Sequence, residues 1–304
     1  MLVEIGRQRT ETYPVLVVNC PPLFEFRTEA VEPNEEVLVL TDGWNGPVAR
    51  SLAVTACGIG ATASLFLMPE TEIHGNEPPK VAVEALATID VAFTATTHSI
   101  THTHARVAAA DTGMRIVILR GVDEGLMLDR GINTDYEWLA ETTAAVRDVL
   151  ADAEEARVTS PAGTDVWMDL TDRPAYSLDG LFHDYGFSAL PPGESPTSPV
   201  EESASGTIVV DYSMDNIGLL ETPIELVFKD GSVAAVRGGT EAERLRELMN
   251  GHENAGNMAE FAIGTNPDAR LGGTSPIIKR NPAPSTSQSA TTRASAERPN
   301  VIST

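Results

Sequence analysis

In the first half of the chain, short apolar runs alternate with segments whose apolar residues recur at helical spacing. The runs predict buried strands, because a strand covered on both faces shows no polar alternation. Gly58 and Gly113 lie at the ends of helical segments, where a left-handed residue commonly closes a helix. Alternating strands and helices predict a parallel sheet with helices on both faces. The predicted strands are 36–41, 62–68, 91–96 and 115–119, and the predicted helices are 47–57, 81–88 and 102–111.

A longer helix is predicted after these units. Thr134 and Glu137 have capping-box spacing, in which the hydroxyl and the carboxylate each bind a free backbone amide. Apolar residues recur along one face as far as Leu150, and charged residues fill much of the rest. We therefore expect an amphipathic helix at this point of the chain.

The pattern changes after about Ala156. Strand-like segments are now separated by turn pairs, and Lys229-Asp230-Gly231-Ser232 predicts a hairpin. Thr240 and Glu243 form a second capping box, opening a helix that Gly251 can close. This half predicts a separate α+β domain, mostly antiparallel. Its strand-like segments are at Val158 and at 167–170, 207–211, 224–228 and 233–236.

The predicted fold class is thus α/β, with an N-terminal parallel-sheet α/β domain, an α+β domain and a disordered tail. Residues 1–30 are uncertain, although Tyr13–Cys20 could form an edge strand. The two domains are expected at 31–156 and 157–280. Residues 281–304 are rich in Ser, Thr, Ala and Pro, so they bury too little apolar surface to offset their chain entropy.

The net charge of the chain argues against functions that require binding to nucleic acids. The chain of 304 residues carries 44 acidic and 21 basic residues, a net charge of −23. Such a field repels phosphate backbones, so we expect no nucleic-acid partner. Only three of the basic residues are lysines. This acid-rich, lysine-poor composition suggests a halophilic protein, the alternative being an ordinary acidic one; a halophilic protein should unfold when salt is diluted.

The sequence predicts a cytoplasmic protein without a membrane partner. Cys20 and Cys57 are the only cysteines, too few for a disulfide framework. The N-terminus lacks the apolar core of a signal peptide. Ser51–Met68 has no charge but contains glycines and hydroxyl residues and is followed by Pro69. A helix, a glycine turn and a buried strand explain this stretch better than a membrane span.

Two glutamates and a histidine run are candidates for chemistry. On a helix, His98 and His102 would share a face and could bind a divalent metal, or they could line a helix entry or subunit contact. Glu194 follows a stiff Pro-Pro-Gly turn and suits a hard cation, or it simply faces solvent. Glu260 lies among small and apolar residues, so it could be buried and bound to metal, or paired with an arginine such as Arg237 or Arg270.

A turn at residues 160–165 is a weaker candidate. Ser160-Pro-Ala-Gly-Thr-Asp165 brings a hydroxyl and a carboxylate together, which could orient a substrate amine. The same residues could equally form an ordinary turn that binds its own backbone.

Taken in order, several short motifs resemble the M29 metallo-aminopeptidase family, the group of thermophilic aminopeptidase T. The resemblance covers roughly Val31 to Gly273. The motifs are Met68-Pro-Glu70, His74-Gly75, Glu77-Pro-Pro79, Ser99-Ile-Thr-His-Thr103, Ala105-Arg106, Gly163-Thr-Asp165, Leu190-Pro-Pro-Gly-Glu194 with Thr197 and Pro199, Gly206-Thr207, Ala259-Glu-Phe261 and Gly264-Thr-Asn-Pro267.

The resemblance implies a metal-dependent aminopeptidase that removes N-terminal residues from peptides, usually as a homodimer. Two close divalent ions, zinc, cobalt or manganese, would polarise the scissile carbonyl and activate a bridging water. The family's metal-binding glutamates fall on Glu194 and Glu260. The resemblance also implies that four peripheral site residues bind substrate: His102, Arg106, Thr164 and Asp165. The family's further catalytic carboxylate has no match in this sequence.

The chain departs from this family near its C-terminus. Relatives continue past the Asn-Pro turn with a Gly-Thr-x-His strand, a tyrosine and a final His-x-Asp, which supply further ligands. Here the match fades after Gly273, and the last tyrosine is Tyr212. We therefore expect an aminopeptidase-like protein that is incomplete, and inactive by itself if the ligand segment is missing.

Two alternatives remain open. The same superfamily includes a ring-cleaving dioxygenase that acts on dihydroxypyridine with one non-haem Fe(II). In that branch a histidine corresponds to Glu260, and the position of Glu194 is not acidic, so the carboxylates favour the peptidase. The other alternative is a non-catalytic dimeric remnant with a binding cleft.

Overall fold

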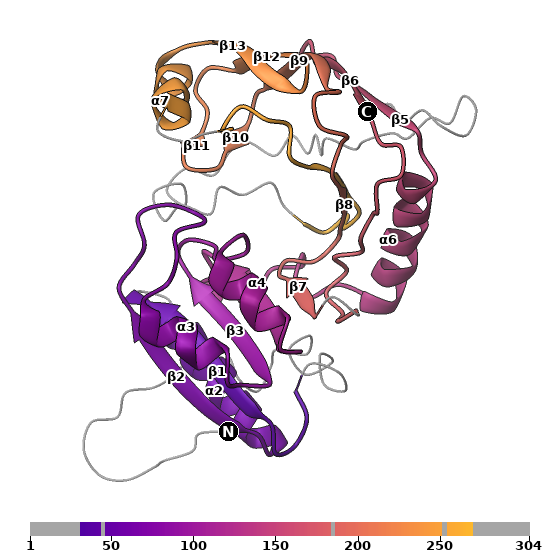
Figure 1. Cartoon of the computed structure of the whole chain (residues 1–304). Helices are drawn as coiled ribbons and strands as arrows, with labels where there is room; N and C mark the ends of the chain where they lie inside the picture. The colour runs from indigo at the N-terminus through magenta and orange to yellow at the C-terminus, as the bar shows by residue number, and fades with distance from the viewer. Residues whose placement is uncertain (1–30, 44–45, 184–185, 251–253, 270–304) are drawn as a thin grey trace.

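The computed structural model describes residues 31–43, 46–183, 186–250 and 254–269. The expectations for residues 1–30, including the edge strand at Tyr13–Cys20, and for the tail at 281–304 lie outside these ranges. The described chain forms two five-stranded sheets at opposite ends of the molecule (Figure 1).

The first sheet, sheet A, is parallel throughout, with strand order β2-β1-β3-β4-β7. Its central strands are nearly fully buried, as uninterrupted apolar runs predict. The first four strands lie where the sequence places them, within one residue at either end. The strands are β1 (Glu36–Asp42), β2 (Thr62–Met68), β3 (Val91–Thr96), β4 (Arg115–Arg120) and β7 (Phe187–Ala189).

Helices cover both faces of sheet A. On one face, Val48 and Leu52 of α2 (Gly46–Ile59) pack against Val37 and Val39 of β1. On the other, α3 (Lys80–Leu86) and α4 (His104–Ala110) pack against a core that contains Leu40. The parallel-sheet prediction is therefore confirmed.

Local details of the helices differ from the predictions. Asp135, not Thr134, caps α6 (Tyr136–Ala151), because its carboxylate accepts the amide of Trp138. The predicted helix 102–111 begins only at His104, after Thr103 has capped it. His98 and His102 therefore do not share a helix face. The short helix α5 (Glu124–Met127) precedes α6.

The second sheet, sheet B, is antiparallel, with order β13-β12-β9-β6-β5. Asp230 and Gly231 both have positive φ in the predicted hairpin between β12 and β13, as a tight hairpin turn requires. α7 (Thr240–Asn250) follows β13; Gly251 lies outside the described residues. The strands are β5 (Glu155–Thr159), β6 (Asp165–Asp169), β9 (Ser205–Val210), β12 (Ile224–Lys229) and β13 (Ser232–Arg237).

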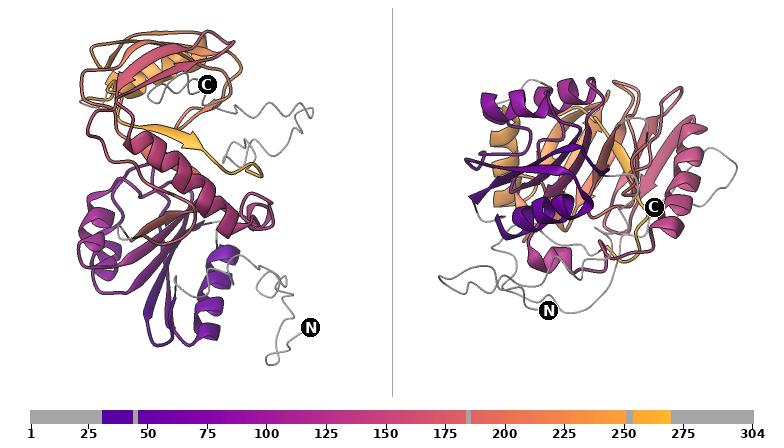
Figure 2. Two further views of the ribbon diagram at one scale, coloured as in Figure 1. Left: turned by 90° about the vertical axis from the view of Figure 1, so that its right-hand side faces the viewer. Right: turned by 90° about the horizontal axis from the view of Figure 1, so that it is seen from below.

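Three connections link the two sheets. β7 follows two strands of sheet B in the chain but pairs with β4 of sheet A. Leu150, near the end of α6, belongs to the core of sheet B. β8 (Glu194–Thr197) and β14 (Phe261–Gly264) form an antiparallel pair that lies between the sheets beside α6 (Figure 2). The predicted boundary at residue 156 therefore marks a change of sheet type, with one later strand returning to sheet A.

Among the described residues, no helix combines the length and the apolar character that crossing a membrane requires.

Candidate functional site

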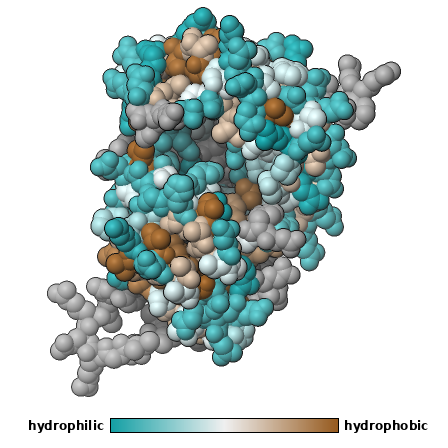
Figure 3. All heavy atoms as spheres, in the orientation of Figure 1, coloured by the Kyte–Doolittle hydropathy of each residue, from teal (hydrophilic) through white to brown (hydrophobic). Residues whose placement is uncertain are grey.

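The candidate site lies where loops from the carboxyl edge of sheet A meet loops from sheet B. In a parallel sheet with strand order 2-1-3-4-5, ligands bind at this edge, beside the switch point between β1 and β3. The surface is hollowed between the two sheets (Figure 3). Six side chains meet here and are called the inter-sheet cluster: His74, His98, Arg120, Glu194, Asp215 and Glu260.

His98 is fixed by the end of β1. The buried carboxylate of Asp42 accepts the amide of Thr97 at 2.8 Å and its hydroxyl at 2.9 Å. The Thr96 hydroxyl then donates to the carbonyl oxygen of His98 at 2.7 Å. These bonds hold the loop after β3 in one path. Nδ1 of His98 is buried and has no hydrogen-bond partner within the described part of the chain.

His74 lies against His98. The two rings meet edge to face, with centroids 4.9 Å apart. The amide of Ser99 donates to Nδ1 of His74 at 2.9 Å, so the neutral ring carries its proton on Nε2. Burial lowers the pKa of His74 to about 4, with a further contribution from the positive charge of Arg120. His74 is therefore a neutral hydrogen-bond donor at physiological pH.

Arg120, the last residue of β4, acts electrostatically on both His74 and Glu194. Its Nη1 atom pairs with Asp215 at 2.6 Å. Asp215 lies in the turn between β10 (Ser213–Met214) and β11 (Gly218–Leu219). The next residue, Asn216, accepts the backbone amide of His74 through Oδ1 at 3.3 Å. The β10–β11 hairpin thus contacts both the end of β4 and the loop that carries His74.

Glu194 lies at the start of β8, in a turn built by two of the sequence motifs. Gly193 has a φ of +109°, and a Cβ there would lie 2.4 Å from Cβ of Asn266. Asn266 in turn donates to the carbonyl oxygens of Pro192 and Gly131, both at 2.8 Å. The Pro-Pro-Gly and Gly-Thr-Asn-Pro turns therefore dock on each other, and only glycine fits between them.

The two glutamates come close enough for their charges to interact. Water reaches Glu194, yet the surrounding protein raises its pKa by desolvation, and repulsion from Glu260 raises it further. Arg120 opposes both effects. A carboxylate whose pKa is raised by the surrounding protein and by a nearby like charge is typical of a functional site.

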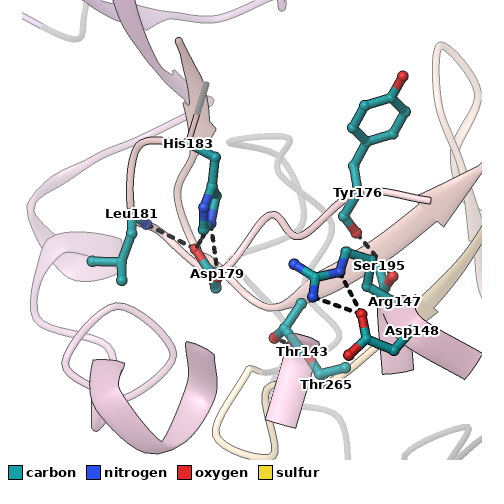
Figure 4. A network of polar contacts seen from close by, with 9 residues as sticks. All are labelled: Thr143, Arg147, Asp148, Tyr176, Asp179, Leu181, His183, Ser195 and Thr265. Carbon is teal, nitrogen blue, oxygen red and sulfur yellow. Dashed lines mark hydrogen bonds and ion pairs between the residues drawn. The ribbon is translucent and has the colours of Figure 1, made fainter. Parts of the chain in front are cut away.

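Buried polar contacts hold the segments next to Glu194 and Glu260 in place (Figure 4). The hydroxyl of Ser195, beside Glu194, donates to the carbonyl oxygen of Tyr176 at 2.9 Å. Thr143 of α6 shares a 2.7 Å hydrogen bond with Thr265, after β14. Nε2 of His183 lies 3.0 Å from both carboxylate oxygens of the buried Asp179. β8, which begins with Glu194, is thereby tied to the segment before β7, and the residue after β14 is tied to α6.

The other predicted substrate-binding residues make different contacts. His102 is exposed between β3 and α4. Arg106 donates to the carbonyl oxygen of Thr101 and lies 5.6 Å from the centroid of the Phe187 ring. Thr164 bonds the backbone of Val209 in sheet B.

Asp165 forms a two-bond ion pair with Arg157 across β5 and β6. No contact described here joins Thr164 or Asp165 to the inter-sheet cluster, and their bonds are those of an ordinary turn and strand pair. Arg237 does not neutralise Glu260, because it pairs with Glu225. The assignment of His102, Arg106, Thr164 and Asp165 to a substrate site stays a prediction.

The sequence analysis missed Arg120, Asp215 and Asn216. Their signal was weak, because an arginine at a strand end and polar residues in a turn are common. The metal prediction for Glu194 and Glu260 also lacks a complete ligand set: within the ranges that the structure describes, no three His, Cys, Asp or Glu side chains form a group that could hold a metal ion.

Comparisons with known proteins give the family. The family model of NicX, 2,5-dihydroxypyridine 5,6-dioxygenase, matches residues 23–282. The curated enzyme 2,5-dihydroxypyridine 5,6-dioxygenase of Pseudomonas putida KT2440 is 28% identical over 211 residues. That match covers 68% of this chain and 55% of the relative, so the chain spans about half the length of the enzyme it matches.

Solved structures agree on the fold. The 2,5-dihydroxypyridine dioxygenase from Pseudomonas putida KT2440 has a TM-score of 0.71 at 22% identity, covering 84% of this chain and 79% of that chain. Wild-type AmpT from Thermus thermophilus has a TM-score of 0.54 at 18% identity, covering 82% of this chain and 78% of its own. AmpT therefore shares the fold with this chain.

These findings correct the sequence interpretation. The prediction of a hydrolase, an aminopeptidase of the metalloprotease class, is wrong, because the family model and the curated relative are both dioxygenases. No finding supports a pair of zinc, cobalt or manganese ions. The assignment of Glu194 and Glu260 as metal ligands stays a prediction, and their two turns dock on each other in this structure.

Proposed function

The chain belongs to the family of 2,5-dihydroxypyridine 5,6-dioxygenases, and from that premise we propose that it is a ring-cleaving dioxygenase for a dihydroxylated pyridine. The observation that carries the proposal is the family match, which extends through both sheets and includes the whole inter-sheet cluster. The substrate and the reaction are those of the relatives, and we propose them for this chain.

The histidine pair suits a hydroxylated ring. His74 offers an N–H donor at Nε2, because Nδ1 already accepts the amide of Ser99. Nδ1 of His98 is a buried acceptor or donor without a partner in the described residues. A buried polar atom of this kind is normally satisfied by a ligand or by water. A ring hydroxyl can accept from one imidazole and donate to the other.

Fe(II) is the cofactor that we propose, and the described residues do not hold it by themselves. Non-haem iron oxygenases use two histidines and one carboxylate with open positions. The described residues contain no group of three such side chains able to hold a metal. An iron site would therefore need at least one ligand from outside them, and no step of the reaction is assigned to a residue as an iron ligand.

Oxygen consumption tests the proposal. The full chain, loaded with Fe(II) without oxygen, is mixed with 2,5-dihydroxypyridine and oxygen. We expect one O₂ to be consumed per ring, with loss of the ring's ultraviolet absorbance. Iron-free protein is the control. Ring binding without oxygen consumption would favour the non-catalytic alternative, and neither binding nor consumption would refute the proposal.

A pair of variants tests the role of the histidines without iron. Calorimetry of ring binding to iron-free protein should show at least a tenfold weaker affinity for His98→Ala, because a hydrogen bond of roughly 1.4 kcal/mol or more is lost. His104→Ala is the matched control, because its side chain is exposed on α4. Equal affinities for the two variants would remove His98 from the site.

A further inference from the structure

The hairpin β10–β11 crosses from sheet B to the loops of sheet A. Asp215 in its turn pairs with Arg120 at the end of β4, and the neighbouring Asn216 accepts the backbone amide of His74. Two consecutive residues therefore bind two different segments of the opposite sheet, the end of β4 and the loop that carries His74. Strands of two residues each cannot form a stable hairpin by themselves, so these contacts also give the hairpin its position.

His74 is held from its own sheet as well. Gly75 donates its amide to the carbonyl oxygen of Ser99 at 2.9 Å, and Ser99 donates its own amide to Nδ1 of His74 at 2.9 Å. Asn76 accepts the amide of Ile73. The ring is thus fixed by the loop after β3, and the backbone of the loop that carries it is fixed by the hairpin.

We propose that Arg120, Asp215 and Asn216 are positioning residues, which hold the loop of His74 from the opposite sheet and set the charge around its ring, whose neutral form carries the proton on Nε2. The hydrogen bond from this proton to a ring oxygen of the ligand rests on the proposed function. The positioning itself rests only on contacts within this chain.

The charges around His74 make the proposal testable. The groups that act on it are Arg120, which lowers its pKa, Asp215, which raises it, and His98, which lowers it, while burial is the largest cause. The two partners of one ion pair therefore act on His74 with opposite signs. A purely structural clamp would respond in the same way to the loss of either partner.

The experiment follows the ring nitrogens of His74 by ¹⁵N NMR in the full chain between pH 5 and 7. With a pKa of about 4, roughly one tenth of His74 is protonated at pH 5. Arg120→Gln should increase that fraction several-fold, yet the pKa should stay below 6.5, because burial remains. Asp215→Asn should decrease it. Asn216→Ala should leave it nearly unchanged and accelerate amide exchange at His74.

Arg147→Gln is the matched control. Arg147 pairs with Asp148 at 2.6 Å, as Arg120 does with Asp215, and the exposures of the two pairs agree within a few per cent. The control should leave the protonated fraction of His74 unchanged. The proposal is overturned if Arg120→Gln and Asp215→Asn shift His74 in the same direction, if neither shifts it, or if neutral His74 carries its proton on Nδ1.

This result is independent of catalysis. If the NMR shifts appear but the chain neither binds the ring nor consumes oxygen, the positioning stands and the proposed function fails. If oxygen is consumed but the shifts are absent, the function stands and the positioning fails.

Discussion

Sheet A and sheet B are of equal strand number but differ in how they contribute to the site. The central strands of sheet A, β1, β3 and β4, are nearly fully buried, and they deliver Asp42, the loop to His98 and Arg120 directly from their carboxyl ends. Most residues of β9 and β13 in sheet B are only half-buried. Sheet B reaches the site through the β10–β11 hairpin. The buried parallel sheet thus places site residues at its own strand ends, whereas the antiparallel sheet contributes through a hairpin that extends to the site.

The largest expected effect tests whether burial really separates the two sheets. Ile116 of β4 is fully buried, whereas Ile208 of β9 is half-buried. Ile116→Ala should lower the free energy of unfolding by about 4 kcal/mol, and Ile208→Ala by about 1–2 kcal/mol, because less apolar surface is lost. Urea unfolding followed by circular dichroism measures both. Equal losses would contradict the comparison.

A second effect concerns a close approach inside sheet B. Gly206 has a φ of +129°, and a Cβ there would lie 2.2 Å from the carbonyl oxygen of Asp165. Gly206→Ala should therefore cost about 3 kcal/mol, from strain and from forced separation of β6 and β9.

Gly113→Ala is the control for this substitution. Gly113 also has positive φ, +89°, but its Cβ would meet nothing within 4 Å. Only the left-handed backbone is then penalised, by about 1 kcal/mol. Thermal unfolding of both variants separates the two terms, and identical melting temperatures would show that the sheet can give way at Gly206.

The bond between α6 and the segment after β14 should have a smaller effect. Thr143→Val keeps the shape of a fully buried side chain but removes its 2.7 Å hydrogen bond to Thr265. We expect a loss of about 1 kcal/mol in the free energy of unfolding. Thr112→Val, at an exposed hydroxyl that bonds within its own turn, should change it less. A larger effect for Thr112 would show that α6 does not join the sheets through this bond.

The smallest effect has the opposite sign and depends on pH. Because desolvation and Glu260 raise the pKa of Glu194 above its unfolded value, the folded state prefers the protonated form, and stability is lost as pH rises through the folded pKa. Glu194→Gln should therefore stabilise the chain at pH 7, by less than about 1 kcal/mol since water screens the charge.

The same gain should disappear below about pH 4, where Glu194 is protonated in both states. Unfolding in urea at pH 4 and pH 7 measures the difference. Glu201→Gln is the control, because a hydrogen bond from its own backbone amide, together with Arg173, lowers the pKa of that exposed carboxylate, so its loss should be neutral or destabilising at pH 7. Destabilisation by Glu194→Gln at pH 7 would mean that its carboxylate has a partner.

Much of the fold could be predicted because its signals are local. Residues 62–68 and 91–96 are strands with the predicted bounds, since apolar runs between turn residues have few other structures open to them. Asp230-Gly231 gave the hairpin for the same reason. β7 could not be predicted, because three residues carry no periodicity and only pairing with β4 makes them a strand.

The candidate site could be predicted only in part. The motif turns at Glu194 and Glu260 were visible, and the structure brings their charges together. The hydrolase function inferred from them was wrong, because one fold can host more than one reaction. Arg120 and Asp215 were invisible, since they are 95 positions apart and meet only when the hairpin reaches across to β4.

The sequence by itself determined the main strands and helices, the type of each sheet and the hairpin turn at Asp230-Gly231, because these depend on neighbours along the chain. Only the tertiary structure decided that His74 is neutral with its proton on Nε2, and that Arg120 faces both a histidine and a glutamate. Burial and charge at a side chain are set by groups distant in the sequence, and no local pattern records them.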